Sequence, residues 1–351
     1  MSEAVCGTLL QIMKGEVHIS NEDQPRLIPE PNTAAGRAPD FAAAVQPSYV
    51  RTVFFGPDGL KPGWGFAFYV AMFYPLQFIA TRWAGSFEPA NALFSTMLEE
   101  FGVLLAANLP AMVLARVERR HWASYGLPLR QALGKLFWIG ALWGFAAITL
   151  LLAAMYGLRV FDFGHLALHG ARIAKFAVFW GIFFLLVGLY EDFLFRGYTQ
   201  FTLTRLIGFW PAAVLLSCTF GLIHLQNGGE QWAGLLAAAA IGFFFCLTLQ
   251  RTGSLWFAVG FHAAWDWGET FFYSVPDSGT IFPGHLLKSS FHGPRWLTGG
   301  QVGPEGSLLC LVVVALVWIA FSRMYPNVKY VEVSSPTDIC TWCAAKRRGV
   351  R

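Results

Sequence analysis

The chain has 351 residues, of which 55% are hydrophobic, 16% are aromatic and only 13% are charged. Because water-soluble domains carry about 25% charged residues, this composition excludes an ordinary soluble domain and indicates a polytopic membrane protein. The formal net charge of +4 is small, and it suits cationic segments beside an anionic membrane surface rather than binding to nucleic acid.

The start of the chain is mixed in character and rich in Pro and Ala, and it lacks the apolar segment of a secretory signal. We predict a loosely ordered cytosolic leader over 1–62, a transmembrane helical bundle over 63–323 and a basic cytosolic tail over 324–351. Cys340 and Cys343 in the tail form a lone C-x-x-C, for which free thiols are favoured over a zinc site.

Eight stretches are apolar and long enough, at about twenty residues, to cross a membrane as helices. In chain order they are 64–81, 91–115, 136–156, 173–195, 209–226, 232–250, 255–273 and 306–322. The fourth stretch has no helix breaker after Gly197, and we expect the helix to continue to about residue 206. The segment 274–305 is rich in Gly, Pro and Ser and is predicted to be an external loop. The predicted fold class is therefore all-α, a polytopic membrane helical bundle of about eight transmembrane helices.

Lys and Arg in the connections between these stretches set the predicted orientation. They are most frequent between the second and third stretches and in the tail, and both segments lie inside if the N-terminus is cytoplasmic. Arg205 and Arg251 agree with this placement, whereas Arg159, Arg172 and Lys175 fit it less well. We therefore predict a multi-pass integral membrane protein with both termini cytoplasmic.

Ionisable side chains within the apolar stretches are costly unless they are paired or face water, so each marks a candidate functional site. The candidates are Glu99, Glu100, Glu191, Asp192, Arg196, His224, His262, Asp266 and Glu269. Glu99 and Glu100 are interpreted either as residues lining a cavity or as acids at the interfacial end of a span that begins later. Glu269 could line a cavity mouth, but we favour an interfacial position for it.

Helical spacing relates several of these candidates to one another. Asp192 and Arg196 are four residues apart on one helix face and can form an ion pair. Glu191 is rotated by about 100° from Asp192, so it is left without a local partner. His262 and Asp266 are also four residues apart, and Asp266 can therefore hold the orientation and tautomer of the His262 imidazole.

Three short motifs resemble those of the CPBP family of intramembrane proteases, which includes CAAX prenyl endopeptidases and bacterial Abi or bacteriocin-processing proteins. "EDFLFRG" is similar to Glu-Glu-x-x-x-Arg with Asp as the second acid, "FGLIH" to Phe-x-x-x-His, and "HAAWD" to His-x-x-x-Asn or Asp. The matching residues are Glu191, Asp192, Arg196, Phe220, His224, His262 and Asp266. The motifs come in the family's order on successive apolar segments, and the resemblance covers a protease core of about 173–273.

The resemblance implies a helical bundle with an internal cavity open to the cytosol, and hydrolysis of a peptide bond near the membrane surface. It implies that Glu191 is a general base acting on a water that His224 also holds. It further implies that His262 and Asp266 contact the developing oxyanion or a metal ion. Asp192, Arg196 and Phe220 of the same motifs are expected to have structural, supporting roles.

The sequence leaves the dependence on a metal open. Glu191, His224 and His262 can hold Zn²⁺ with an open fourth position, which would generate hydroxide directly. A metal-free mechanism, with a glutamate base and a donor at the oxyanion, suits the same residues. Asp266 stands where Asn is common in the family, and an ionised Asp266 cannot donate to an oxyanion. It must therefore be protonated, orient His262 or bind a metal.

The favoured function is that of an intramembrane endopeptidase acting on a membrane-anchored substrate, with a prenylated CAAX peptide as the eukaryotic substrate class. The expected partners are membrane lipids and a lipidated or membrane-anchored peptide or protein, and no nucleic acid. One alternative is a proton-coupled transporter, for which repeated halves would be expected and none is apparent in the sequence. The other is a non-catalytic immunity or scaffold protein, against which the presence of Glu191, His224 and His262 argues.

Overall fold

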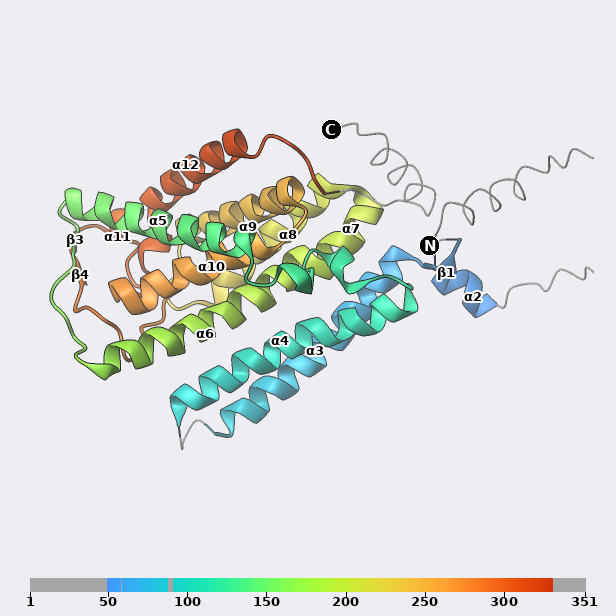
Figure 1. Cartoon of the computed structure of the whole chain (residues 1–351), viewed down its shortest axis with the longest axis horizontal. Helices are drawn as coiled ribbons and strands as arrows, with labels where there is room; N and C mark the ends of the chain where they lie inside the picture. The colour runs from blue at the N-terminus through green and yellow to red at the C-terminus, as the bar shows by residue number, and fades with distance from the viewer. Residues whose placement is uncertain (1–48, 58, 88–90, 331–351) are drawn as a thin grey trace, which may run out of the picture. The chain divides into compact units, whose positions relative to one another are not determined.

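The computed structural model describes residues 49–57, 59–87 and 91–330, most of which are helical (Figure 1). The α-helices are α2 (Tyr49–Phe54), α3 (Pro62–Gly85), α4 (Ala92–Val117), α5 (Lys135–Gly157), α6 (Ala171–Phe193), α7 (Thr199–Ile207), α8 (Phe209–Ile223), α9 (Trp232–Thr252), α10 (Trp256–Trp267), α11 (Arg295–Thr298) and α12 (Leu308–Met324). The short strands are β1 (Phe55–Gly56), β2 (Gly59–Leu60), β3 (Phe161–Asp162) and β4 (Ser290–Phe291). Most of the predicted leader and tail, including Cys340 and Cys343, lies outside the described residues.

Six helices of the described part are long and apolar enough to cross a membrane. They are Pro62–Gly85, Ala92–Val117, Lys135–Gly157, Ala171–Ile207, Phe209–Gln226 and Trp232–Thr252. The other two predicted stretches are also helical but shorter, because α10 passes into a π-helical segment, η5 (Gly268–Tyr273), and α12 has 17 residues. Large apolar side chains such as Phe78, Trp138 and Val178 are exposed on the helices, as expected for surfaces in contact with lipid.

Four connections meet at one end of the helices, which we call the basic end. They are the segments 118–134, 208, 253–255 and 325–330. The amide of Leu255 donates to the carbonyl of Gly126 at 2.8 Å, and the amide of Lys329 donates to the carbonyl of Gln250 at 2.9 Å. The basic side chains at or near this end are Arg51, Lys61, Arg116, Arg119, Arg120, Arg130, Lys135, Arg205, Arg251, Arg323 and Lys329.

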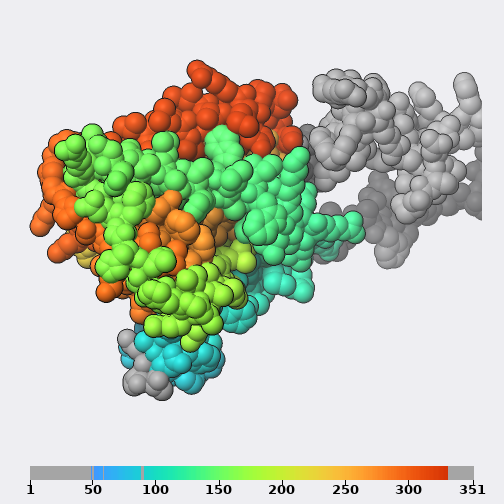
Figure 2. All heavy atoms as spheres, turned by 60° about the vertical axis from the view of Figure 1, so that its left-hand side comes forward, coloured from blue at the N-terminus to red at the C-terminus, as the bar shows by residue number. Residues whose placement is uncertain are grey.

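The opposite end, which we call the loop end, is formed by the segments 158–170, 224–231 and 274–307. Strands β3 and β4 pair antiparallel with Phe161 opposite Phe291, which fixes the first of these segments against the third. Figure 2 shows this packing, with the green connection between α5 and α6 lying against the orange segment that follows α10. The basic residues on this side are Arg82, Arg159, Arg172, Lys175, Lys288 and Arg295.

Helix α10 packs against α5 at a distance that only glycine permits. A Cβ atom at Gly140 or Gly144 would lie 2.1 Å from the carbonyl oxygen of Phe257 or Phe261, respectively. Small residues at such positions are typical of close packing between membrane helices. The side chains of Phe257 and Phe261 are almost fully buried as a result, and α10 forms a fixed platform for the polar residues that it carries.

The helix that begins with α6 continues to Ile207, close to the predicted end at residue 206. It is interrupted by a π-helical segment, η3 (Leu194–Tyr198), in which Gly197 has φ −88° and ψ −111°. A Cβ at Gly197 would lie 2.6 Å from the ring of Phe193, so this turn requires glycine. π-Helical turns occur frequently at functional sites, and this one contains Arg196 of the first motif.

Candidate functional site

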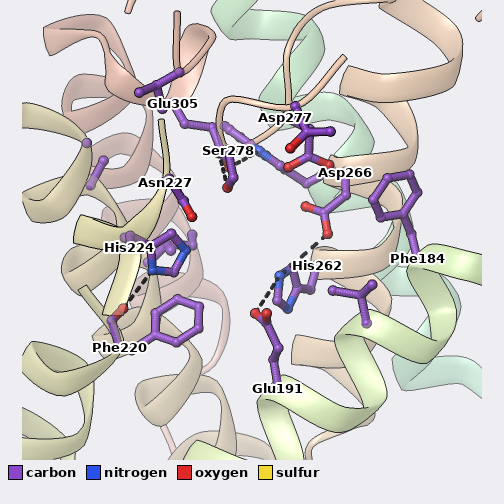
Figure 3. Close-up of a pocket in the computed structure, with 18 of the residues that line it drawn as sticks. Phe184, Glu191, Phe220, His224, Asn227, His262, Asp266, Asp277, Ser278 and Glu305 are labelled. Atoms are coloured by element: carbon purple, nitrogen blue, oxygen red, sulfur yellow. Dashed lines mark hydrogen bonds and ion pairs between the residues drawn. The ribbon is translucent and has the colours of Figure 1, made fainter. Parts of the chain in front are cut away.

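One pocket, with a volume of about 240 Å³, is lined by every candidate of the three motifs that was assigned a catalytic role. Glu191 reaches it from α6, His224 from the C-terminal end of α8, and His262 and Asp266 from α10. Figure 3 shows Glu191, His224 and His262 around the same space, with His224 on the wall opposite His262. Residues of the loop end complete the lining, among them Asn227, Glu230, Asp277, Ser278 and Glu305.

His262 lies among three carboxylates. Its Nε2 atom is 3.6 Å from Oε2 of Glu191 and 3.5 Å from Oδ2 of Asp266, and its Nδ1 atom is 3.6 Å from Oδ2 of Asp192. The pairing of His262 with Asp266 is the one that the four-residue spacing predicts. The contact with Glu191 depends on close packing of α6 and α10, since a Cβ at Gly188 would lie 3.5 Å from Cβ of His262.

His224 has a defined orientation. Its Nδ1 atom is 2.7 Å from the backbone carbonyl oxygen of Phe220. Because a carbonyl oxygen can only accept, Nδ1 carries the proton, and in a neutral ring Nε2 is the acceptor. The ring also contacts that of Phe220, with a centroid distance of 4.8 Å. The spacing of the second motif therefore positions an imidazole whose second nitrogen is free to hold a water molecule.

One carboxylate oxygen of Glu191 accepts a hydrogen bond within the protein, and the other faces His262. Oε1 accepts a hydrogen bond of 2.9 Å from the hydroxyl of Tyr190. Glu100 lines the same pocket from α4, and its Oε2 is buried without a hydrogen-bond partner among the described residues. Helix α4 begins at Ala92, so Glu99 and Glu100 lie about two turns inside the helix. Their position relative to the membrane interface stays a prediction.

Arg196 joins the first motif to the second. Its Nη1 atom lies 3.4 Å from Oδ1 of Asp192, and both side chains are fully buried. The guanidinium carbon is 4.4 Å from the ring centroid of Phe220, and it is 5.6 Å from those of Phe195 and Phe245. Cation–π contacts of this kind are stronger in a desolvated site. Arg196 thus holds Asp192, which faces His262, and Phe220, whose carbonyl orients His224.

Several residues of the site were not predicted from the sequence. Asn227 and Glu230 follow α8, and Asp277 and Glu305 lie near the two ends of the segment that was interpreted only as an external loop. Burial raises the pKa of Glu230 above its usual value. Glu269, for which an interfacial position was favoured, is fully buried beside these acids. No spacing rule relates these acids, because loops of the chain bring them together.

The Zn²⁺ alternative requires Glu191, His224 and His262 to bring their ligand atoms together. In the described part of the chain, the group of His, Cys, Asp or Glu side chains whose ligand atoms all lie within 4.8 Å of one another is a different one, Asp266, Glu269, Asp277 and Glu305. The ligand atoms of Glu191, His224 and His262 do not all lie within this distance of one another.

Comparison with protein families matches residues 173–268 to the family described as "Type II CAAX prenyl endopeptidase Rce1-like". The matched segment includes all three motifs, from Glu191 to Asp266. No curated protein and no solved structure matches the chain.

Proposed function

Because residues 173–268 form a domain of the Rce1-like type II CAAX prenyl endopeptidase family, which implies an intramembrane protease, we propose that the chain hydrolyses a peptide bond in a membrane-anchored protein. The gathering of Glu191, His224 and His262 around one pocket between apolar helices supports this assignment most directly. Carboxylates and imidazoles are costly in such surroundings, and they are typically retained there for function.

In the proposed mechanism, Glu191 and Nε2 of His224 hold the attacking water. Glu191 takes a proton from this water while the water oxygen attacks the carbonyl carbon of the substrate. The tetrahedral intermediate carries its negative charge on the former carbonyl oxygen. Glu191 then gives the proton to the leaving amine, the C–N bond breaks, and the products are a carboxylic acid and an amine.

His262 is proposed to stabilise the oxyanion. With protons on both ring nitrogens, it presents Nδ1–H to Asp192 and Nε2–H to the pocket. A donor aimed at the developing negative charge contributes about 10²–10³-fold to the rate of such reactions. Asp266, which cannot donate when it is ionised, lies 3.5 Å from the same nitrogen, a distance longer than an ordinary hydrogen bond. It is proposed to hold the charged imidazole in place by its negative charge, which leaves Nε2–H for the oxyanion.

We also propose that α10 and α12 cross the membrane with the six longer helices, which gives eight crossings. The pocket is then lined by connections of the loop end, while most Lys and Arg lie at the basic end. With this proposed topology, a pocket that opens at the loop end lies on the side of the membrane opposite the basic end. The charges favour a cytoplasmic basic end, so we propose that the pocket opens on the other side. The substrate is then anchored on that side, rather than being a prenylated CAAX tail on the cytosolic leaflet.

Cysteine labelling tests this orientation. In a background without the six native cysteines, Lys288→Cys at the loop end is expected to react with a membrane-impermeant maleimide in intact cells. Arg130→Cys at the basic end, the matched control, is expected to react only after the cells are permeabilised. Both positions are exposed in the structure, so reactivity reports the side of the membrane. The reverse pattern would place the pocket on the cytosolic side.

Peptidase activity can be tested with the purified full chain in proteoliposomes and a panel of fluorogenic peptides carrying a lipid or apolar anchor. We expect the wild type to cleave members of the panel and His224→Gln to lose activity by about 10²-fold or more. His292→Gln, which alters an exposed His at the loop end, should cleave like the wild type. Undiminished cleavage by His224→Gln would show that His224 does not hold the attacking water. No cleavage of any peptide would favour the transporter or non-catalytic alternatives.

A further inference from the structure

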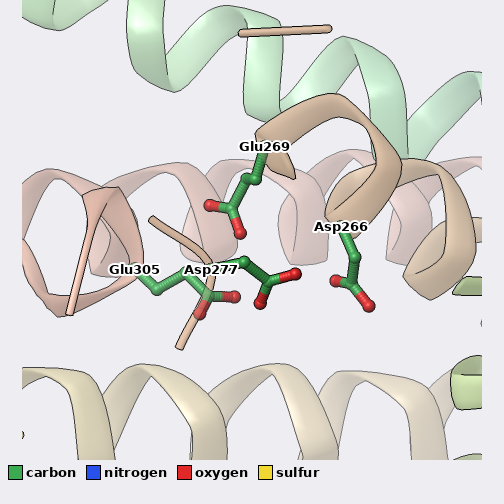
Figure 4. A group of neighbouring side chains, drawn as sticks. All are labelled: Asp266, Glu269, Asp277 and Glu305. Carbon is green, nitrogen blue, oxygen red and sulfur yellow. The ribbon is translucent and has the colours of Figure 1, made fainter. Parts of the chain in front are cut away.

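Four carboxylates gather next to the catalytic pocket. Asp266, Glu269, Asp277 and Glu305 each offer an oxygen atom, and these atoms lie within 4.8 Å of one another (Figure 4). Asp266 lies in the last turn of α10, and Glu269 lies about one turn later in η5. Asp277 follows in the loop, and Glu305 lies in the short helix η6 (Pro304–Gly306). The cluster therefore connects α10 to both ends of the segment 274–307.

Glu269 is the member that most clearly requires a ligand. Its side chain is fully buried and directed toward the other three carboxylates (Figure 4). Neither of its oxygens has a hydrogen-bond partner among the described residues. Among the described residues, no Lys, Arg or His forms an ion pair with Glu269, Asp277 or Glu305. A buried carboxylate without a partner is costly, so a cation or a proton must compensate for its charge.

The surrounding donors fix two of the carboxylates but leave oxygens available. Thr270 Oγ1 donates to Oδ2 of Asp277 at 3.2 Å. Trp265 Nε1 and Ser278 Oγ each donate to one oxygen of Glu305, both at 3.1 Å. Neighbouring donors therefore orient the carboxylates of Asp277 and Glu305, but these donors bring no positive charge to the cluster.

We propose that Asp266, Glu269, Asp277 and Glu305 bind a hard divalent cation such as Ca²⁺ or Mg²⁺. All four ligands are carboxylate oxygens, which these cations prefer, whereas zinc sites typically include His or Cys. Three of the four residues line the pocket, so the cation can reach the site from it. The site is distinct from the group formed by Glu191, His224 and His262, and it does not depend on the proposed peptidase activity.

The position of Asp266 gives the cation a structural consequence. Its Oδ2 atom lies 3.5 Å from Nε2 of His262, so one carboxylate belongs to both the cation site and the environment of that imidazole. Asp277 and Glu305, which belong to the 274–307 segment of the loop end, would be ligands of the same ion. A bound cation would therefore fix the 274–307 segment over the pocket and hold Asp266 in place beside His262.

Terbium luminescence tests this site without any measurement of activity, because Trp265 contacts Glu305 and can transfer excitation energy to Tb³⁺. With the full chain in nanodiscs, we expect sensitised emission that CaCl₂ or MgCl₂ displaces, and a higher Tm in the presence of the preferred cation. Glu269→Gln should weaken Tb³⁺ binding by at least about tenfold, since it removes a ligand charge without changing size. Asp162→Asn, an exposed carboxylate of the same end, should bind like the wild type.

A second variant guards against a folding defect. Asp277→Asn changes a loop residue and should also weaken Tb³⁺ binding, and both variants are expected to have a Tm in EDTA that is at least that of the wild type, because they relieve charge repulsion. If the wild type, Glu269→Gln and Asp277→Asn gave the same emission and the same Tm response, the carboxylates would hold protons and the proposal would fall. An absence of any response in the wild type would have the same meaning.

Discussion

Replacement of Glu191 by Gln is expected to lower kcat/KM for a membrane-anchored peptide by about 10³-fold, because the amide cannot take a proton from the attacking water. Gln keeps the size of the side chain and can still accept the hydrogen bond from Tyr190. The Tm should therefore change little, and the loss should lie in kcat rather than in KM. The measurement is steady-state cleavage of one peptide by the purified variants in proteoliposomes.

The matched control for this change is Glu230→Gln. Glu230 also lines the pocket, but it lies in the loop after α8, where its carboxylate accepts a hydrogen bond from the amide of Gln231. Its replacement should leave kcat within about tenfold of the wild type, since no proton transfer is assigned to it. Equal activity of Glu191→Gln and Glu230→Gln would show that Glu191 is not the base.

Replacement of Arg196 by Met is expected to destabilise the protein by about 3–5 kcal/mol, because it leaves the buried carboxylate of Asp192 without its partner. The contact with the ring of Phe220 is also lost. Activity should fall together with stability, since Asp192 faces His262 and the carbonyl of Phe220 orients His224. Unfolding in mixed micelles of a mild detergent and SDS measures the change in stability.

Two further variants separate charge from shape. Arg196→Lys keeps the charge but not the planar guanidinium, so an intermediate loss of stability is expected. Asp192→Asn combined with Arg196→Met removes both charges and should be more stable than Arg196→Met alone. Arg130→Met, at an exposed position of the basic end, is the control and should have little effect. A stability of Arg196→Met equal to that of this control would contradict the proposed role of the buried pair.

Much of the site could be predicted from the spacing of residues along single helices. The contacts of Asp192 with Arg196 and of His262 with Asp266 are both between residues four apart, and the structure contains both. The contact of Glu191 with His262 could not be derived in this way, because it depends on how closely two separate helices pack. That packing is set by small residues such as Gly188, whose effect becomes visible only when the neighbouring helix is known.

The cluster of acids at the loop end lay beyond the reach of sequence patterns. Asp277 and Glu305 stand in a Gly- and Pro-rich segment, where no periodicity indicates which side chains turn inward. Glu269 was favoured as an interfacial acid over a residue that lines the cavity mouth, and in the structure its side chain, in the π-helical segment, is fully buried. The apolar stretches themselves were predictable, since each of the eight coincides with a helix, and six of these helices are long and apolar enough to span a membrane.

The most direct test of the central claim, that Glu191 and His224 act on one water molecule, is a double-mutant cycle. It compares kcat/KM of the wild type, Glu191→Gln, His224→Gln and the combined variant on the same anchored peptide. If both residues hold the same water, the combined variant should be no slower than the slower single variant, because the second change removes an interaction that is already lost. Losses that multiply in the combined variant would mean that the two residues act independently and would contradict the account.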